Sequence, residues 1–235
     1  MLSDPASLGN LPAEAAQSLF EPDFWRRRNS LVEAARGRGS AWFVNFGASR
    51  WVLRHYRRGG YIARFCEDRY VWTGETRVRA FAEWRLLELL NERGLPVPKP
   101  IAARYQRSGL LYRCELITQR IADARPLSET LMVSAMPEAT WRAVGAAVAE
   151  LHRAGVDHAD LTAHNLLLDE QGTVSVIDFD RGRLRAPGAW TARNLQRLRR
   201  SLAKVSRGLP ADRFSAQMWE WLRAGYAARL GRAVQ

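Results

Sequence analysis

The chain has 235 residues, is 47% hydrophobic and carries a formal net charge of +12 at pH 7. This length allows one two-lobed enzyme or two small domains, with enough apolar residues for a sizeable core. The two cysteines exclude a disulfide framework, no apolar run reaches the ~20 residues of a transmembrane helix, and we expect no secretory signal at the start.

Arginine carries almost all of the positive charge, since Lys99 and Lys204 are the only lysines. A strong positive field indicates an anionic partner such as a nucleotide, a nucleic acid or an anionic membrane. The alternative is an arginine-rich solvated surface without a specific partner.

Residues 1–33 are interpreted as an N-terminal extension. Residues 1–17 are mostly small and polar, and we expect them to be loose. Residues 20–28 are first aromatic and then basic. That order is typical either of an interfacial membrane anchor or of a short helix that packs Phe24 and Trp25 on the core.

Residues 34–121 are expected to form a β-rich lobe. Strands are predicted over residues 41–46, 50–56 and 110–121. Residues 77–93 have the apolar spacing of a helix, and Gly94 and Pro96 follow as typical stop signals.

Residues 122–235 are expected to form a helical second lobe, because polar and turn residues cluster around 119–126. Helices are predicted over residues 137–154, 191–206 and 211–230. Between the first two of these helices, apolar runs at 166–168 and 174–177 flank a polar turn that contains Gly172. This pattern predicts a β-hairpin.

Three polar residues frame this hairpin: Asp160, Asn165 and Asp178. A hairpin brings its ends together, so Asn165 and Asp178 should meet, with Asp160 on the loop that leads in. Transfer of a γ-phosphoryl group needs a divalent metal and a carboxylate that accepts the proton of the attacking hydroxyl. We therefore predict Asn165 and Asp178 as Mg²⁺ ligands and Asp160 as the catalytic base. The alternative is that all three are ordinary turn and cap residues.

The same stretch resembles the protein-kinase motifs H-R-D-L-x-x-x-N and D-F-G. Here the motifs read HADLTAHN over 158–165 and DFD over 178–180. Ala159 replaces the arginine that pairs with a phosphorylated activation loop, Asp180 replaces the glycine, and no A-P-E segment follows. The resemblance implies an α+β, bilobal protein-kinase-like fold with a reduced helical second lobe, as in small-molecule kinases. A zinc site is not expected, because His158 more often buttresses such a loop and no third strong ligand follows at a fitting spacing.

The kinase resemblance also implies a glycine-rich turn that covers the triphosphate of ATP. Gly37 and Gly39 precede the first strand of the β-rich lobe, where this turn is expected. We predict both as nucleotide-binding residues, with a plain turn as the alternative.

A kinase of this type carries a lysine in the motif V-A-I-K, paired with a glutamate. No lysine precedes Lys99, so an arginine must serve. Arg54 is the first choice and Arg64 the reserve. Glu83 is the expected partner, with Glu88 as its rival. The alternative is an edge-strand arginine that faces solvent.

The chain further resembles the 3-deoxy-D-manno-octulosonic acid (Kdo) kinases of lipopolysaccharide synthesis, over about residues 34–206. The segments that carry this resemblance are VLRHYRRGG (52–60), GLPVP (94–98), GVDHADL (155–161), IDFDRG (177–182) and NLQRLRRSL (194–202). Thr162 departs from the pattern, where that family often carries asparagine. The resemblance implies ATP as donor and the 4-hydroxyl of Kdo on a lipid A precursor as acceptor. It also implies an anionic membrane surface as partner, at the cytoplasmic face of the bacterial inner membrane.

The residues alone lead to an ATP-dependent phosphotransferase that acts on a hydroxyl, and they define neither the acceptor nor the oligomeric state. A heptose kinase or an aminoglycoside-type kinase of the same fold is the nearest alternative. A basic nucleic-acid-binding protein would suit the charge and the nine tryptophans but leaves the Asp160 set unexplained, so no nucleic acid is expected as partner. A pseudokinase scaffold would suit the missing lysine and Asp180.

Overall fold

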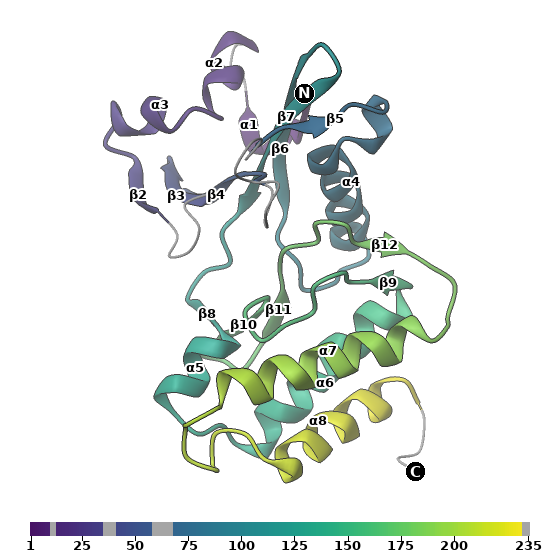
Figure 1. Cartoon of the computed structure of the whole chain (residues 1–235). Coiled ribbons are helices and arrows are strands. Elements are labelled where there is room, and N and C mark those ends of the chain that lie inside the picture. The colour runs from purple at the N-terminus through teal and green to yellow at the C-terminus, as the bar shows by residue number, and fades with distance from the viewer. Residues whose placement is uncertain (10–12, 35–40, 58–67, 232–235) are drawn as a thin grey trace. The chain divides into compact units, whose positions relative to one another are not determined.

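The computed structural model describes residues 1–9, 13–34, 41–57 and 68–231 (Figure 1). Contacts within the chain define two compact units. The first unit comprises Met1–Glu88 and Pro98–Arg120, and the second comprises Leu89–Val97 and Ile121–Gln235. The first is rich in β-strands and the second in helices, so the α+β fold class predicted from the sequence is confirmed.

The first unit is built on an antiparallel sheet that has seven strands within the described residues. These strands are β1 (Leu2–Ser3), β2 (Leu31–Ala34), β3 (Ala41–Phe46), β4 (Ser49–His55), β5 (Tyr70–Val71), β6 (Pro100–Ser108) and β7 (Leu111–Gln119). They follow the order β1-β6-β7-β4-β3-β2, and β5 pairs with β7. The helical segments are α1 (Pro5–Leu8), α2 (Ala13–Ser18), α3 (Pro22–Arg26), a 3₁₀ turn at Glu75–Arg77 and α4 (Arg79–Glu92). The last turn of α4 belongs to the second unit.

The N-terminal residues contribute to the core of this sheet instead of forming a loose segment. β1 pairs with β6, and Leu8 is buried, so the expectation of a loose start is wrong for the described part of residues 1–17. Phe24 and Trp25 are also buried, and Trp25 packs edge-on against Trp51 with 6.1 Å between ring centroids. The core-packing interpretation of these two aromatic rings is confirmed, and neither ring is exposed for a membrane anchor.

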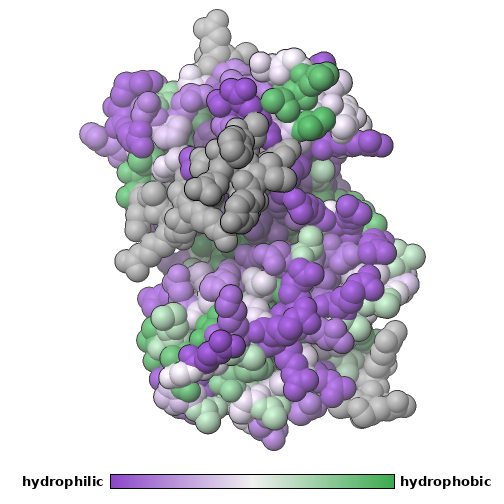
Figure 2. Space-filling view, in the orientation of Figure 1, coloured by the Kyte–Doolittle hydropathy of each residue, from purple (hydrophilic) through white to green (hydrophobic). Residues whose placement is uncertain are grey.

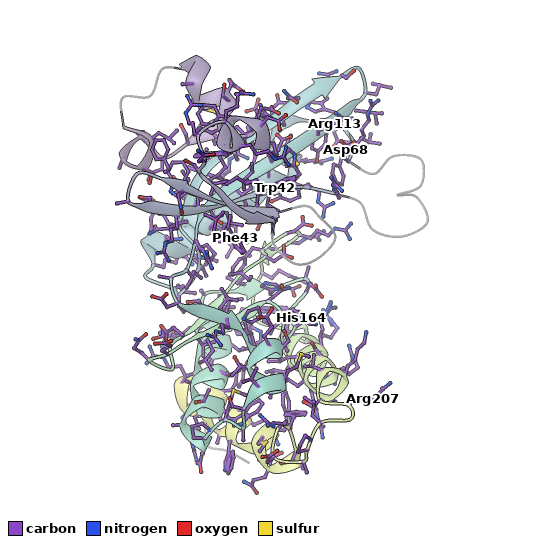
Figure 3. All side chains as sticks on the ribbon, turned by 90° about the vertical axis from the view of Figure 1, so that its left-hand side faces the viewer. Trp42, Phe43, Asp68, Arg113, His164 and Arg207 are labelled. Carbon is purple, nitrogen blue, oxygen red and sulfur yellow. The ribbon has the colours of Figure 1, made fainter. Side chains whose placement is uncertain are left out.

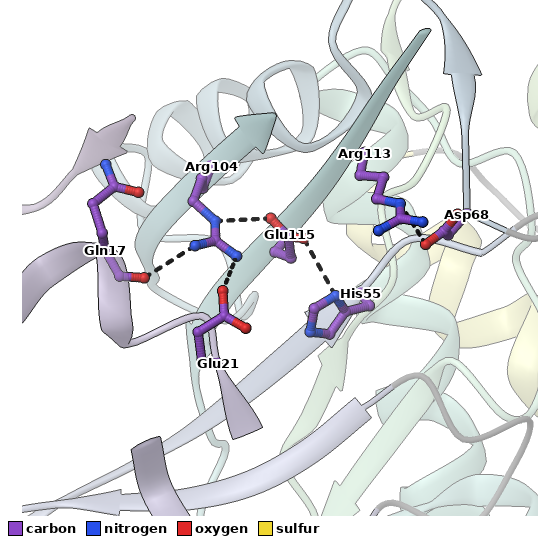
Figure 4. A network of polar contacts seen from close by, with 7 residues as sticks. All are labelled: Gln17, Glu21, His55, Asp68, Arg104, Arg113 and Glu115. Atoms are coloured by element: carbon purple, nitrogen blue, oxygen red, sulfur yellow. Dashed lines mark hydrogen bonds and ion pairs between the residues drawn. The ribbon is translucent and has the colours of Figure 1, made fainter. Parts of the chain in front are cut away.

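A buried polar network ties the N-terminal segment to the sheet (Figure 4). Arg104 on β6 donates to Glu115 on β7 at 3.1 Å, to the Gln17 carbonyl at 3.1 Å and to Glu21 at 2.8 Å. His55 approaches the other Glu115 oxygen at 3.3 Å. Burial alone would raise the pKa of Glu115, but the hydrogen bond from His55 and the charge of Arg104 outweigh it and lower that pKa.

We expect Arg104→Met to lower the free energy of unfolding by about 3–5 kcal/mol, because it leaves the buried Glu115 carboxylate without its cation. Arg113→Met is the matched control, since Arg113 pairs with Asp68 at 2.7 Å on the surface of the same sheet (Figures 3 and 4). Loss of an exposed pair should cost no more than about 1 kcal/mol. Chemical denaturation of both variants tests this, and equal losses would contradict it.

In its described part, the second unit contains four helices, short strands and the last turn of α4. The helices are α5 (Leu127–Val133), α6 (Glu138–Arg153), α7 (Trp190–Val205) and α8 (Ala216–Arg229). The strands are β8 (Ala124–Pro126), β9 (Val156–Asp157), β10 (Leu166–Asp169), β11 (Val174–Val176) and β12 (Arg183–Leu184). Among the described strands, β11-β10-β8 form one sheet and β9 pairs with β12. The face that α7 crosses is mostly hydrophilic (Figure 2).

Helix α6 is the core helix of this unit and leads the chain to the loop that follows it. Its predicted apolar stripe is confirmed, since the four residues of that stripe are buried: Trp141, Val144, Val148 and Leu151. A Cβ at Gly145 would lie 2.0 Å from the Leu222 carbonyl oxygen, so the small residue lets α8 approach closely. Gly155 then ends the helix in a left-handed conformation, with φ of 77°.

Candidate active site

The predicted hairpin brings two of the three expected site residues to one place in the second unit. β10 and β11 pair antiparallel, with Leu166 opposite Val176 and Leu168 opposite Val174. Beyond this ladder the Ile177 N–H donates to the Asn165 carbonyl at 3.0 Å, so Asn165 and Asp178 lie at the same end. The predicted hairpin and the meeting of its ends are therefore confirmed, whereas the chemical roles of the two residues stay predictions.

His158 fixes the loop that carries Asp160 to this end of the hairpin. The Asp160 N–H donates to His158 Nδ1 at 3.2 Å, which leaves Nε2 to donate to the Ile177 carbonyl at 3.0 Å. The ring packs against buried Phe179 with centroids 4.9 Å apart. Burial lowers the pKa of His158, so the imidazole is held neutral in this tautomer. His158 therefore supports the loop, as the sequence indicated, and His164 is exposed (Figure 3).

Asp160 combines a tethered backbone with an exposed side chain. Asn165 Nδ2 donates to the Asp160 carbonyl at 2.8 Å, which joins the loop to the start of β10. The Asp160 side chain remains 62% exposed. A carboxylate held on a fixed backbone but open to solvent can meet an incoming hydroxyl, as a general base requires.

Asp178 adopts a backbone conformation that is unusual for a residue other than glycine. Its φ is 63°, in the left-handed region, and Phe179 directly after it is buried. Such conformations cost energy and cluster at functional sites, where the surrounding structure enforces them. Here the hairpin ladder on one side and the buried Phe179 on the other hold the carboxylate at the end of β11.

The oxygen donors at this end of the hairpin fit Mg²⁺ in kind and number. Mg²⁺ prefers hard oxygen ligands and commonly takes one or two from protein, with the remainder from phosphates and water. Asp178 supplies a carboxylate, and Asn165, whose Nδ2 is engaged with Asp160, supplies an amide oxygen. The described residues contain no group of three or more His, Cys, Asp or Glu side chains that could hold a metal ion by themselves.

A second polar group, in the first unit, is formed by Arg54, Tyr56 and Glu83. The Arg54 guanidinium on β4 forms an ion pair with Glu83 on α4, which is 3% exposed. Arg54 also donates to the Tyr56 hydroxyl at 3.0 Å, and that hydroxyl donates to Glu83. Burial, followed by the charge of Glu83, raises the pKa of Tyr56 well above its usual value, so the hydroxyl keeps its proton.

Sequence reasoning expected the Arg54–Glu83 contact but missed Tyr56. The available signal was its position two residues after Arg54, which places both side chains on one face of a strand. Gly37, Gly39 and the reserve residue Arg64 lie outside the described residues.

The second unit carries a loop carboxylate and an Asn–Asp oxygen pair at one end of a hairpin, and the first unit carries a strand–helix Arg–Glu pair. These are the kinds of group that kinase-type phosphotransferases use. The model of the Lipopolysaccharide kinase (Kdo/WaaP) family matches residues 22–226, so the chain belongs to that family.

Curated relatives agree with this assignment. A 3-deoxy-D-manno-octulosonic acid kinase of Stenotrophomonas maltophilia (strain K279a) is 49% identical over 195 residues, or 82% of this chain and 77% of the relative. The kinase of the same name from Xanthomonas axonopodis pv. citri (strain 306) is 50% identical over 193 residues, with the same shares covered. Among solved structures, the Cydia pomonella granulovirus kinase PK-1 matches with a TM-score of 0.48 and 13% identity, over 74% of this chain and 58% of that one.

Proposed function

We propose that this protein transfers the γ-phosphoryl group of ATP to the 4-hydroxyl of a Kdo residue on a lipid A precursor, in lipopolysaccharide core biosynthesis. The observation that carries the proposal is the assembly of Asp160, Asn165 and Asp178 at one end of the β10–β11 hairpin. Membership of the Kdo/WaaP family and relatives named as Kdo kinases support the acceptor class. A heptose kinase or an aminoglycoside-type kinase has no comparable support.

In this mechanism the acceptor hydroxyl oxygen attacks the γ-phosphorus, and the bond to the ADP oxygen breaks. Asp160 orients the hydroxyl and takes its proton as the new bond forms. Asn165 and Asp178 would hold Mg²⁺, which when bound offsets the charge of the phosphate oxygens. Asn165 contributes twice, because its amide nitrogen also fixes the Asp160 carbonyl at 2.8 Å.

Arg54 is proposed to contact the phosphates of ATP in place of the usual lysine. Its side chain is 22% exposed, whereas its partner Glu83 is 3% exposed. A buried carboxylate that accepts from both Arg54 and Tyr56 holds the guanidinium in one orientation. Arginine keeps its charge at any physiological pH and presents several donors, so it can perform this positioning. Gly37 and Gly39 remain proposed as nucleotide-binding residues.

The test of function is a radiolabelled γ-phosphate assay with a panel of acceptors. The panel contains a Kdo-bearing lipid A precursor, a heptosyl lipid, soluble Kdo and an aminoglycoside. The proposal expects label on the Kdo lipid, and on position 4 of its Kdo ring by product analysis. Label on the heptosyl lipid or the aminoglycoside alone would overturn the acceptor assignment.

We also propose a peripheral position on an anionic membrane at the cytoplasmic face of the inner membrane. None of the helices within the described ranges has the length and apolar character needed to cross a bilayer. The support is the net charge of +12 and the exposed basic run Arg26, Arg27 and Arg28. Because Phe24 and Trp25 are buried, the attraction proposed here is electrostatic and involves no insertion of these rings.

We therefore expect the protein to sediment with anionic vesicles at low salt and to be released at high salt. The reason is that the Debye screening length falls from about 10 Å at 0.1 M salt to about 3 Å at 1 M. Each basic residue near such a surface contributes about 1 kcal/mol, so replacing Arg26, Arg27 and Arg28 by Ser should weaken partitioning about 100-fold. The corresponding triple Lys variant keeps the charge and is the control. Equal recovery with neutral and anionic vesicles would remove the membrane proposal and leave the kinase proposal intact.

A further inference from the structure

Helix α7 turns one polar stripe toward the loop that carries Asp160. The stripe consists of Asn194, Arg197 and Ser201, whose spacing of three and then four residues places them on one helix face. They lie within the NLQRLRRSL segment, which the catalytic motifs leave without a role. Each of the three contacts a different position of the loop.

Two of these contacts engage the loop backbone. The Asn194 amide is buried, and its orientation is assigned so that both of its polar atoms are paired. In this orientation Nδ2 donates to the His158 backbone carbonyl at 3.0 Å, and Oδ1 accepts from the His158 backbone N–H at 3.2 Å. Farther along, the Ala163 N–H donates to Ser201 Oγ at 3.1 Å. Helix α7 therefore holds the loop backbone on both sides of Asp160, and neither of these two contacts involves a side chain of the loop.

The third contact reaches Asp160 itself. Arg197 Nη1 donates to the Ala159 carbonyl and lies 4.0 Å from Asp160 Oδ1. The Arg197 side chain is 40% exposed, so its guanidinium is accessible to solvent, as the Asp160 carboxylate is. The Arg197 guanidinium thus fixes the peptide group that precedes Asp160 and also lies beside the Asp160 carboxylate.

A cation beside the Asp160 carboxylate would have two effects on the proposed phosphoryl transfer. A carboxylate base must work close to an anionic triphosphate, and a neighbouring cation offsets that repulsion and limits the rotation of the carboxylate. Position 159 holds alanine, which cannot supply a charge. Arg197 approaches the same carboxylate from a helix that begins 30 residues later in the chain, at Trp190.

We propose that Arg197 is a positioning residue for phosphoryl transfer, which aims Asp160 at the acceptor hydroxyl. Asn194 and Ser201 complete a permanent clamp, so the loop geometry is set by the fold and requires no phosphorylated activation segment. The inference rests on the proposed function, because it assumes that Asp160 is the base.

The test compares Arg197→Ala and Arg197→Lys with Arg193→Ala, which removes the same charge from an exposed position of the same helix. A misplaced catalytic group costs up to about 100-fold in rate, so kcat of Arg197→Ala should fall about 10- to 100-fold. The KM for ATP should change little, and added guanidinium or the Lys substitution should restore part of kcat. Arg193→Ala should keep wild-type kcat.

Amide hydrogen exchange of the nucleotide-free protein gives a readout that needs no acceptor. Peptides that cover residues 158–165 should exchange faster in Arg197→Ala, while peptides of α6 should not change. Wild-type kcat in Arg197→Ala would overturn the proposal. So would faster exchange throughout the second unit with no rescue by guanidinium, because that would indicate general support of the fold. A wild-type protein that phosphorylates no Kdo acceptor would overturn the proposed function, and the exchange result would still decide whether α7 clamps the loop.

Discussion

Asp160→Ala is expected to abolish turnover while leaving the affinity for nucleotide nearly unchanged. The base acts on the acceptor hydroxyl and not on ATP, so its loss should appear in kcat. General base catalysis is typically worth ~10²–10⁴-fold, and the loss should be at least of that order. Steady-state kinetics with the Kdo lipid, together with titration of a fluorescent ATP analogue, measures the two quantities separately.

The matched control is Glu170→Ala, which removes an exposed carboxylate from the turn at the other end of the hairpin. This variant should keep both turnover and nucleotide affinity. Because general base catalysis supplies ~10²-fold or more, an Asp160→Ala variant that retains more than about a tenth of the wild-type rate contradicts the assignment. A large loss of nucleotide affinity would also contradict it, since it would indicate that Asp160 supports the ATP site.

The hairpin at the centre of the site was predictable because its determinants are local. Two apolar runs and a turn with Gly172 set the pairing of Leu166 with Val176, and this register places Asn165 and Asp178 together. The Arg54–Glu83 contact joins residues 29 positions apart, so periodicity alone does not reveal it. It was expected only because the kinase resemblance requires such a pair, and the absence of lysine before Lys99 left arginine to fill it.

Contacts between distant segments were not predictable in the same way. β1 has two residues and therefore no period, and its position depends on pairing with β6, about 100 residues later. Lys99 adds a tertiary ion pair with Asp4 at 2.5 Å that no local pattern indicates. The burial of Phe24 and Trp25 was one of two interpretations that the sequence left open.

The sequence carries only a weak signal for the contacts between α7 and the loop that holds Asp160. The segment 194–202 contains several arginines, and composition does not reveal which one meets the loop. Only Arg197 shares a helix face with Asn194 and Ser201, so the spacing of the three polar residues distinguishes it. Their contacts with the loop nevertheless depend on how α7 packs within the second unit, which the sequence pattern does not specify.

Asp178→Asn should weaken Mg²⁺-dependent nucleotide binding and activity together. Asparagine is among the residues that best tolerate the left-handed conformation, so the φ of 63° at this position can be kept and the substitution removes mainly a charge. Outer-shell changes alone commonly cost 10- to 100-fold in metal affinity, so loss of a charged ligand should raise the Mg²⁺ requirement by at least about tenfold. Asn165→Ala should have a smaller effect on the Mg²⁺ requirement, because it removes a neutral oxygen.

The measurement is a titration of Mg²⁺ at fixed ATP. It has three readouts: nucleotide binding by calorimetry, thermal stabilisation of the protein, and turnover. Asp169→Asn is the control, since it makes the same charge change at the other end of the hairpin. Asp169 accepts from the Gln171 and Thr173 N–H groups through Oδ1, which asparagine can replace. An Asp178→Asn variant with the Mg²⁺ dependence of the Asp169→Asn control would remove the metal role of Asp178. The base role of Asp160 would then remain open to its own test, because the two residues act on opposite partners of the reaction: the phosphate donor and the hydroxyl acceptor.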